Sequence, residues 1–270
     1  MLDTSPFIVR PGANLSLADI DPRATTGYYG KKTEAKDEIP ALRERIDDLQ
    51  HKLWAESEQA LLVVLQGIDT SGKDGTIRYV FKGVNPQGVR VASFVKPSTR
   101  ELSHDYLWRV HEKTPRRGSI MIFNRSHYED VLVVRVNNLV PEERWSKRYE
   151  HIRQWEQLLT DEGTTVVKFF LHISKKEQLE RLQERANDLQ KNWKFDEGDL
   201  ETRRKWDAFQ EAYQVAINET STANAPWYVV PADRKWFRNL LISTVLVETL
   251  ERMDPQRPAP NPALADLVID

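Results

Sequence analysis

Cysteine is absent from the 270-residue chain. Disulfide bonds, thiolate catalysis and cysteine-ligated zinc sites are therefore excluded. Long apolar runs are missing as well, because the longest one near the C-terminus, residues 240–247, is broken by Ser243 and Thr244 and is too short to span a bilayer. The first ten residues lack the basic start and apolar core of a secretory signal. We therefore expect a cytoplasmic protein with no membrane partner.

A strong overall charge is also missing, since the formal net charge is only −2. This balance gives no indication of a nucleic-acid partner. The charge is nevertheless uneven, because residues 78–125 contain ten Lys/Arg and three acidic residues, a local charge of +7 that leaves −9 for the remainder. One interpretation of this basic block is a localised site for a polyanion. The other is a solvated surface with a chance excess of basic residues.

Short apolar runs alternate with helical patterns along the chain. The runs are rich in branched aliphatic residues and are apolar on both faces, which is typical of strands in a parallel sheet covered by helices. They are residues 60–65, 89–95, 119–123, 166–173 and 227–230. The helical patterns between them are residues 105–113, 142–159, 177–189 and 200–218. The alternation predicts a doubly wound α/β fold with a five-stranded parallel sheet.

The chain divides into three parts. Residues 1–56 are predicted to form an N-terminal arm and a docking helix, since apolar residues recur at helical spacing from residue 39 to residue 56. This stripe consists of Leu42, Ile46, Leu49 and Leu53. It is expected to pack on the core or on a second subunit. Residues 57–253 form the predicted main domain, and residues 254–270, with four prolines, are expected to form an extended tail.

Residues 67–73 have the sequence GIDTSGK and directly follow the first apolar run. This spacing of two glycines and a lysine, between a strand and a helix, is that of a Walker A phosphate-binding loop. The glycines let backbone N–H groups point at an anion, the helix N-terminus adds partial positive charge, and Lys73 neutralises phosphate oxygens. We therefore predict a phosphate-binding site. Its members are Gly67, Thr70, Ser71, Gly72, Lys73, Asp74 and Gly75.

The loop departs from the usual motif at Asp74. A Ser or Thr normally stands there and supplies a hydroxyl ligand to Mg²⁺. Because the metal needs hard oxygen ligands, Asp69 inside the loop is the nearest alternative. A second interpretation makes Asp69 an Asx-turn residue that stabilises the loop. Asp74 itself is suited to cap the helix.

A second polar cluster, NRSHYED at residues 124–130, follows the apolar run 119–123. In many P-loop enzymes an aspartate at this strand end orders Mg²⁺, but here Asn124 takes its place. Arg125 follows at the carboxyl edge of the predicted sheet, where ligands bind. It is well placed to stabilise charge on a transferred phosphoryl group. A structural salt bridge is the alternative role for Arg125.

These departures make the chain recognisable. The stretches VLQGIDTSGKDG and FNRSHYEDVLVVRV resemble the family-2 polyphosphate kinases, and more narrowly their class III. The resemblance runs from about residue 38 to residue 250 and includes VKPSTRELSHDYLWR and APWYVVPAD. It implies a P-loop kinase-like fold with a helical lid at about residues 180–210. It also implies a reversible, Mg²⁺-dependent transfer from polyphosphate to AMP and ADP, forming ADP and ATP, in a homo-oligomer (dimer or tetramer).

The resemblance further implies roles for single residues. The implied catalytic residues are Asp69, Lys73, Arg125, Arg185 and Asp199, of which Asp69 would also hold the metal. Asn124 and Glu129 agree with the class III pattern and, with Lys96, are predicted to contact the nucleotide. Lys82 and Arg117 are predicted to bind further phosphates. Arg181 lies four residues before Arg185 and so shares its helix face. A lid role and pairing with Glu177, Glu180 or Glu184 at the surface are both open for Arg181.

Two other classes of function are open. An ATP-dependent nucleoside-monophosphate kinase has the same fold, although the missing Ser or Thr after Lys73 counts against ATP bound in the usual manner. A non-catalytic module that senses polyphosphate or nucleotide is the second alternative. The presence of Asp69, Lys73 and Arg125 together counts against it.

Overall fold

The computed structural model describes residues 2–190 and 192–262. Its centre is one six-stranded sheet in the order β1-β6-β5-β2-β4-β3. The strands are β1 (Ile8–Val9), β2 (Ala60–Gln66), β3 (Val89–Ser93), β4 (Ile120–Asn124), β5 (Thr164–His172) and β6 (Trp227–Pro231). β1 pairs antiparallel with β6, and all other neighbours pair in parallel. The predicted five-stranded parallel sheet is confirmed, and the two-residue β1 was missed because it is too short to show a pattern.

The two central strands, β2 and β5, are buried along nearly their whole length. In register, Val63 lies opposite Ile122 of β4 and Val167 of β5. This double burial explains why the strands are continuous apolar runs with no polar face. Because the strands are parallel, the residues that follow β2 and β4 meet at one edge of the sheet.

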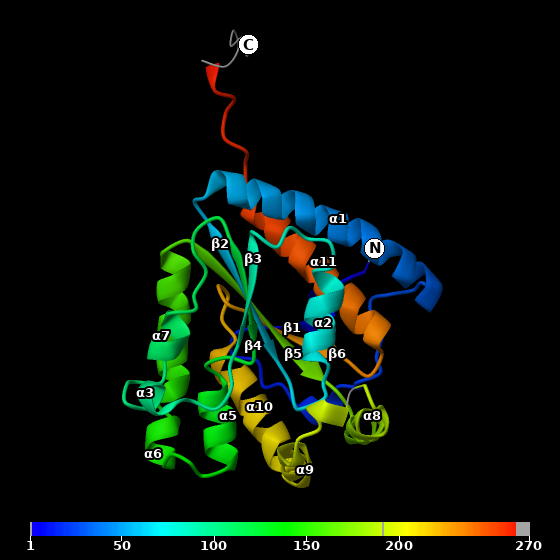
Figure 1. Ribbon diagram of the computed structural model, residues 1–270, viewed down its shortest axis with the longest axis vertical. Coiled ribbons are helices and arrows are strands. Elements are labelled where there is room, and N and C mark those ends of the chain that lie inside the picture. The colour runs from blue at the N-terminus through cyan, green and yellow to red at the C-terminus, as the bar shows by residue number, and fades with distance from the viewer. Residues whose placement is uncertain (1, 191, 263–270) are drawn as a thin grey trace.

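Helices cover both faces of the sheet (Figure 1). On one face lie α1 (Lys32–Glu56), α2 (Lys73–Val80) and α11 (Lys235–Met253), and on the other lie α5 (Glu129–Val136), α7 (Arg148–Asp161) and α10 (Trp206–Thr220). The fold is therefore doubly wound, as predicted. α1 packs along α11, and Ile46, Leu49 and Leu53 of its stripe are buried in the core of this chain. The stripe is thus satisfied within the chain and gives no support for a second subunit.

Several helix boundaries differ from the predictions. α1 begins at Lys32, so that Pro40, a residue favoured in the first turn of a helix, lies in the third turn instead. The predicted helix 105–113 is reduced to α4 (Trp108–His111), preceded by α3 (Thr99–Leu102). The predicted helix 142–159 is divided into α6 (Glu142–Trp145) and α7. The predicted helix 200–218 is interrupted at Lys205, which separates α9 (Glu197–Arg204) from α10.

The lid region is built from α8 (Lys175–Asn187), the 3₁₀ turn η3 (Asn192–Lys194) and α9. The N-terminal arm contains two further 3₁₀ turns, η1 (Ser5–Phe7) and η2 (Leu17–Asp19). Phe7, Val9 and Leu17 of the arm are buried against the core. Residues 254–261 carry no helix or strand and leave the body beyond α11 (Figure 1). Within residues 2–190 and 192–262, none of the helices has both the length and the apolar character needed to cross a bilayer.

Candidate active site

The predicted phosphate loop connects β2 to α2 and requires glycine at two positions. Gly67 has φ 153°, and a Cβ there would lie 2.7 Å from Ser71 Oγ. Gly72 has φ 102°, and a Cβ there would lie 2.2 Å from Nη1 of Arg238. Both contacts are shorter than side chains tolerate, and both backbone conformations favour glycine. The positive φ angles at these two positions therefore favour glycine in the loop over the start of α2.

Lys73 is the first residue of α2 and is buried under the loop. Its Nζ donates to Gly67 O at 2.6 Å and is 3.4 Å from Ile68 O. Burial lowers the pKa of Lys73, and the negative charge of Asp69 opposes this effect. Thr70 Oγ1 and Ser71 Oγ are buried without a hydrogen-bond partner within the described part of the chain. With the unpaired N–H groups of the first turn of α2, these donors form a cradle for an anion.

Arg125 faces the loop from the end of β4. Its backbone N–H donates to Leu65 O of β2 at 3.1 Å, and its guanidinium forms an ion pair with Asp69. The loop and the end of β4 thus meet at the carboxyl edge of the sheet, as predicted. Burial acts to raise the pKa of Asp69, but the positive charges of Lys73 and Arg125 outweigh it and the pKa is lowered. Asp69 is therefore ionised at neutral pH.

The lid brings two more predicted residues to this edge. Arg185 Nη1 donates to Asp199 Oδ2 at 2.8 Å. Burial, followed by the negative charge of Asp69, raises the pKa of Asp199 to about 6. The carboxylates of the loop and of the lid therefore interact electrostatically.

Arg181, by contrast, does not face the pocket. It donates to Thr70 O at 3.0 Å and Ser71 O at 2.8 Å, and it forms an ion pair with Glu177 at 2.8 Å. It therefore holds the phosphate loop from behind. Of the two interpretations of Arg181, pairing with Glu177 is correct, although the pair is largely buried and not on the surface.

In the sequence, Asn124 directly precedes Arg125 and Glu129 follows it four residues later. Asn124 Nδ2 donates to Asp74 Oδ1 at 2.7 Å, so Asp74 links α2 to β4 in addition to its place at the helix start. Glu129 begins α5 and lines the pocket. Burial raises the pKa of Glu129, and the positive charges of Arg125 and Lys73 oppose this effect.

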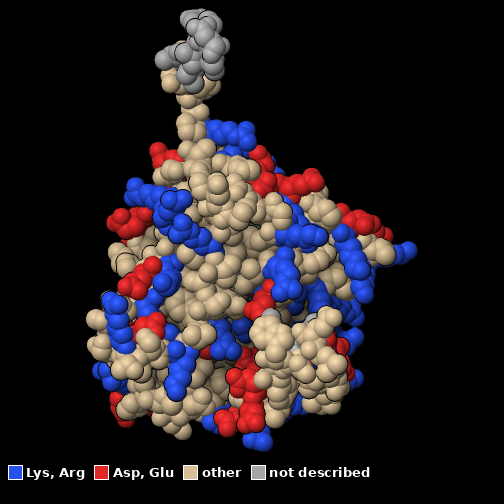
Figure 2. All heavy atoms as spheres, viewed as in Figure 1, with Lys and Arg blue, Asp and Glu red and all other residues tan. Residues whose placement is uncertain are grey.

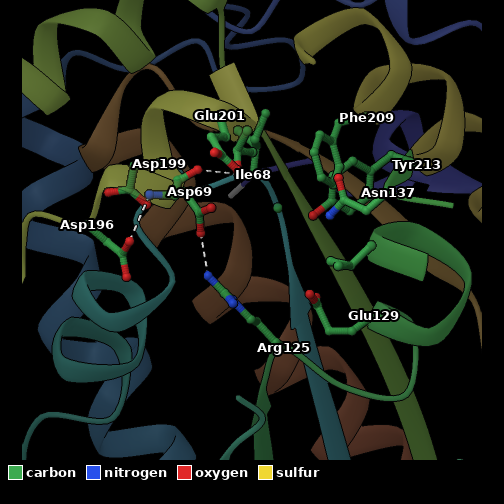
Figure 3. Close-up of a pocket in the computed structure, with 14 residues that line it drawn as sticks. Ile68, Asp69, Arg125, Glu129, Asn137, Asp196, Asp199, Glu201, Phe209 and Tyr213 are labelled. Carbon is green, nitrogen blue, oxygen red and sulfur yellow. Dashed lines mark hydrogen bonds and ion pairs between the residues drawn. The ribbon is translucent and has the colours of Figure 1, made fainter. Parts of the chain in front are cut away.

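A pocket of 270 Å³ lies between the loop, α5 and the lid (Figure 3). Asp69, Asp196 and Asp199 lie on one side, near the guanidinium of Arg125 (Figure 3). Phe209, Tyr213 and Asn137 line the opposite side (Figure 3). These three residues were not predicted from the sequence. The only available signal was that Phe209 and Tyr213, four residues apart, share a helix face, and this spacing is equally typical of core packing.

The carboxylates of the pocket outnumber its cations. Five acidic residues line it beside the single Arg125: Asp69, Glu129, Asp196, Asp199 and Glu201. On the face shown in Figure 2, acidic side chains gather over the region of α9 and α10, and basic side chains are interspersed with acidic ones elsewhere. Divalent cations that accompany a phosphorylated ligand would offset this excess of negative charge.

Asp69 fits the predicted magnesium ligand in chemistry, since it is an ionised carboxylate beside the cradle. Among the described residues, however, no three His, Asp or Glu side chains lie close enough together to hold a metal ion by themselves. Mg²⁺ commonly keeps several waters and binds through one or two carboxylates together with substrate phosphates. The site fits a metal that is held jointly by the protein and its substrate.

Two predicted phosphate-binding residues do not reach the loop. Arg117 precedes β4 and thus lies at the amino edge of the sheet, while the loop lies at the carboxyl edge; five strand residues span roughly 16 Å. Lys82 follows α2, and eight helical residues span about 12 Å from the loop. Both side chains are exposed. Neither residue lines the pocket, and their binding of further phosphates along a polyphosphate chain stays a prediction.

Lys96 follows β3 and so lies at the same edge as the loop, but its exposed side chain is not part of the pocket lining. Its contact with a nucleotide stays a prediction.

An anion cradle between a parallel strand and a helix, faced by an arginine from the neighbouring strand, is the arrangement of P-loop phosphotransferases. The family model described as Polyphosphate kinase 2 (PPK2) matches residues 29–258. The chain belongs to this family and is an enzyme of this type.

Individual relatives agree with the family over nearly the full chain. The chain is 57% identical to an AMP/ADP-polyphosphate phosphotransferase of Meiothermus ruber, with 98% of this chain and 99% of the relative covered. It is 42% identical to an ADP-polyphosphate phosphotransferase of Rhodopseudomonas palustris, covering 97% and 94%. The structure matches the crystal structure of polyphosphate kinase 2 from Arthrobacter aurescens with a TM-score of 0.92 and 39% identity, over 100% of this chain and 94% of that one.

Proposed function

We propose that this protein transfers the terminal phosphoryl group of inorganic polyphosphate to AMP and to ADP, forming ADP and ATP, in a reversible reaction that depends on Mg²⁺. The observation that carries the proposal is the contact between Asp69 of the phosphate loop and Arg125 of β4 at the mouth of the pocket. The similarity to the Meiothermus ruber protein, whose name includes both AMP and ADP, supports the choice of acceptors.

The cradle binds the phosphate groups of the substrates, and the pocket binds the nucleoside. The loop amides, the hydroxyls of Thr70 and Ser71, and Lys73 bind phosphate groups at the start of α2. The nucleoside lies in the pocket against Phe209 and Tyr213, where an aromatic ring offers a flat apolar surface to a base. The reacting phosphates then meet beside Arg125.

Charge stabilisation accounts for the catalysis. Arg125 and Arg185 neutralise the charge that spreads over the transferred group in a loose transition state. Asp69 would hold Mg²⁺ together with the bound phosphates, and the ion would supply additional positive charge to the phosphate oxygens. The acceptor is a phosphate oxygen that is already ionised, so no strong general base is needed. Closure of α8 and α9 over the edge excludes water that would hydrolyse the donor.

A donor comparison tests the proposal. The protein is incubated with Mg²⁺ and AMP, with polyphosphate in one reaction and ATP in another, and ADP and ATP are followed by chromatography. We expect AMP to disappear and ADP and then ATP to form with polyphosphate, and little turnover of AMP with ATP at the same phosphate concentration. Turnover with ATP alone would instead identify a nucleoside-monophosphate kinase. Binding of polyphosphate without any turnover would identify a sensing module.

A cytoplasmic location and a homo-oligomeric state, dimer or tetramer, are further parts of the proposal. The family resemblance supports the homo-oligomer, and the buried α1 stripe adds nothing to this support. Light scattering on the purified protein, with and without polyphosphate, measures the oligomeric state directly; a monomeric mass in both conditions would contradict it.

A further inference from the structure

Arg238 is a buried cation for which the described part of the chain provides no counter-ion. It lies in the first turn of α11, and its side chain is almost fully buried, with 3% of the residue exposed. Its Nε and Nη2 both donate to the neutral amide oxygen of Asn239, at 3.1 and 2.9 Å. Within residues 2–190 and 192–262, Arg238 forms no ion pair with a carboxylate and Nη1 makes no hydrogen bond. A buried charge with this environment is unfavourable in the free protein.

The guanidinium of Arg238 reaches the phosphate loop. A Cβ on Gly72, the residue that precedes α2, would lie 2.2 Å from Nη1, and a Cβ on Gly75 would lie 3.9 Å from Nη2. The head group therefore lies against the N-terminus of α2, where phosphate is predicted to bind. Gly72 leaves room for it, because any side chain at that position would occupy the place of Nη1.

Arg181 contacts the same loop, has a structural role and serves as a comparison for Arg238. It has an ion pair with Glu177 and donates to the carbonyl oxygens of Thr70, Ser71 and Ala232. Arg238 lacks such partners, and the charged neighbour that affects it most is Arg181 itself. Burial, together with the positive charge of Arg181, lowers the pKa of Arg238 to about 9.

We propose that Arg238 is a phosphate-binding residue of the loop, and that the phosphate chain of the substrate supplies its missing counter-ion. Nη1 is the donor that a phosphate oxygen at Gly72 accepts from. The ligand class is a condensed inorganic phosphate, whose charge density is high enough to neutralise both Lys73 and Arg238. This inference rests on the proposed function, since it assumes that the loop binds polyphosphate.

Binding of polyphosphate in the absence of nucleotide tests the inference. Titration calorimetry on the full chain compares the wild type with Arg238→Met, Arg238→Lys and the matched control Arg252→Met, which changes an exposed arginine in the last turn of the same helix. We expect Arg238→Met to weaken binding about ten-fold or more, the scale for losing one charge-assisted hydrogen bond. Arg238→Lys keeps the charge and should stay within about three-fold of the wild type, and Arg252→Met should bind like the wild type.

Two further measurements separate binding from a structural role. The melting temperature of the free Arg238→Met protein should equal or exceed that of the wild type, because an unpaired buried charge is removed. Its rise on addition of polyphosphate should be smaller than in the wild type. In steady-state kinetics, KM for polyphosphate should increase about ten-fold, while KM for AMP and kcat change by less than about two-fold.

The inference is refuted if Arg238→Met binds polyphosphate as tightly as the wild type, or if it lowers the melting temperature of the free protein or prevents folding. A fall in kcat with an unchanged KM for polyphosphate also contradicts it. If the wild type itself does not bind polyphosphate, the proposed function fails together with this inference. If the wild type binds and phosphorylates AMP but Arg238→Met is unaffected, only the role of Arg238 fails.

Discussion

At the scale of single residues, Arg125 has an unusual backbone conformation and lines the pocket beside the phosphate loop. Its φ of 60° lies in the left-handed region, which non-glycine residues rarely adopt. The turn after β4 keeps this conformation because the Arg125 N–H donates to Leu65 O of the neighbouring strand. Strained backbone that is held by its surroundings is frequent at functional sites. Here it directs the guanidinium toward Asp69 and the phosphate loop.

Replacement of Arg125 by alanine should reduce the rate of AMP phosphorylation by about 10²-fold or more, because one charge-stabilising group is lost from the transition state. Arg144→Ala is the matched control, since Arg144 is an exposed residue of α6 that does not line the pocket, and it should keep activity within about two-fold of the wild type. Single-turnover rates at saturating polyphosphate measure both. Equal rates for the two variants would remove Arg125 from the mechanism.

At the scale of elements, a fully buried ion pair ties β5 to the helices that carry the pocket. Lys168 of β5 donates to Glu156 of α7 at 2.6 Å, to the hydroxyl of Tyr128 at 3.0 Å and to Thr220 O at the end of α10 at 2.8 Å. His127 is also within 3.3 Å of Glu156. Tyr128 directly precedes Glu129, so this cluster anchors the turn that presents Arg125 and Glu129. His127 is therefore a structural residue and not a ligand of the site.

Lys168→Met should lower the free energy of unfolding by about 3–5 kcal/mol, because it leaves Glu156 buried without a counter-charge. The double variant Lys168→Met/Glu156→Leu should recover most of the loss, since it removes both charges. Lys176→Met is the control: its partner Glu180 is 3.8 Å away at the surface, and the change should stay within about 0.5 kcal/mol. Urea unfolding measures all three. A double variant less stable than the single one would contradict this account.

The sequence predicted elements better than their ends. The five parallel strands were visible because burial on both faces leaves continuous apolar runs. The division of residues 200–218 into α9 and α10 was not visible in the sequence, because the residue at the interruption, Lys205, is of a type that favours helices. β1 depends on pairing with β6, a contact across more than 200 residues that no local pattern reports.

At the scale of the whole molecule, the lid and the core are coupled through charge. Asp69 belongs to the loop and Asp199 to the lid, and the charge of Asp69 contributes to the raised pKa of Asp199, about 6. Arg185, which forms an ion pair with Asp199, opposes this shift. The pKa of Asp199 therefore depends on how close the lid lies to the loop.

The pH dependence of stability should show this coupling. Because Asp199 binds its proton more tightly in the folded protein than in the unfolded chain, its contribution favours folding at low pH and is lost as pH rises through the window from about 4 to 6. Asp199→Asn lacks this contribution. The difference between the unfolding free energies of the variant and the wild type (variant minus wild type) should therefore increase with pH across the window and level off above it. Urea unfolding between pH 4 and pH 7.5 measures the difference.

The same measurement in an Asp69→Asn background checks the cause. Removal of the Asp69 charge should make the pH-dependent difference smaller, because the largest cause after burial that raises the pKa of Asp199 is then absent. A difference that decreases as pH rises would show that the pKa of Asp199 is lowered, contrary to this structure.

The sequence by itself determined the loop and the family. The glycines and Lys73 have the spacing of a phosphate loop between a strand and a helix, and Asp69, Asp74 and Arg125 stand at positions that match the family's pattern. Only the tertiary structure decided which distant residues join them. It brought Phe209, Tyr213 and Arg238 to the site and left Lys82 and Arg117 away from it, because position relative to the edges of a sheet depends on how the whole chain packs and not on neighbours in the sequence.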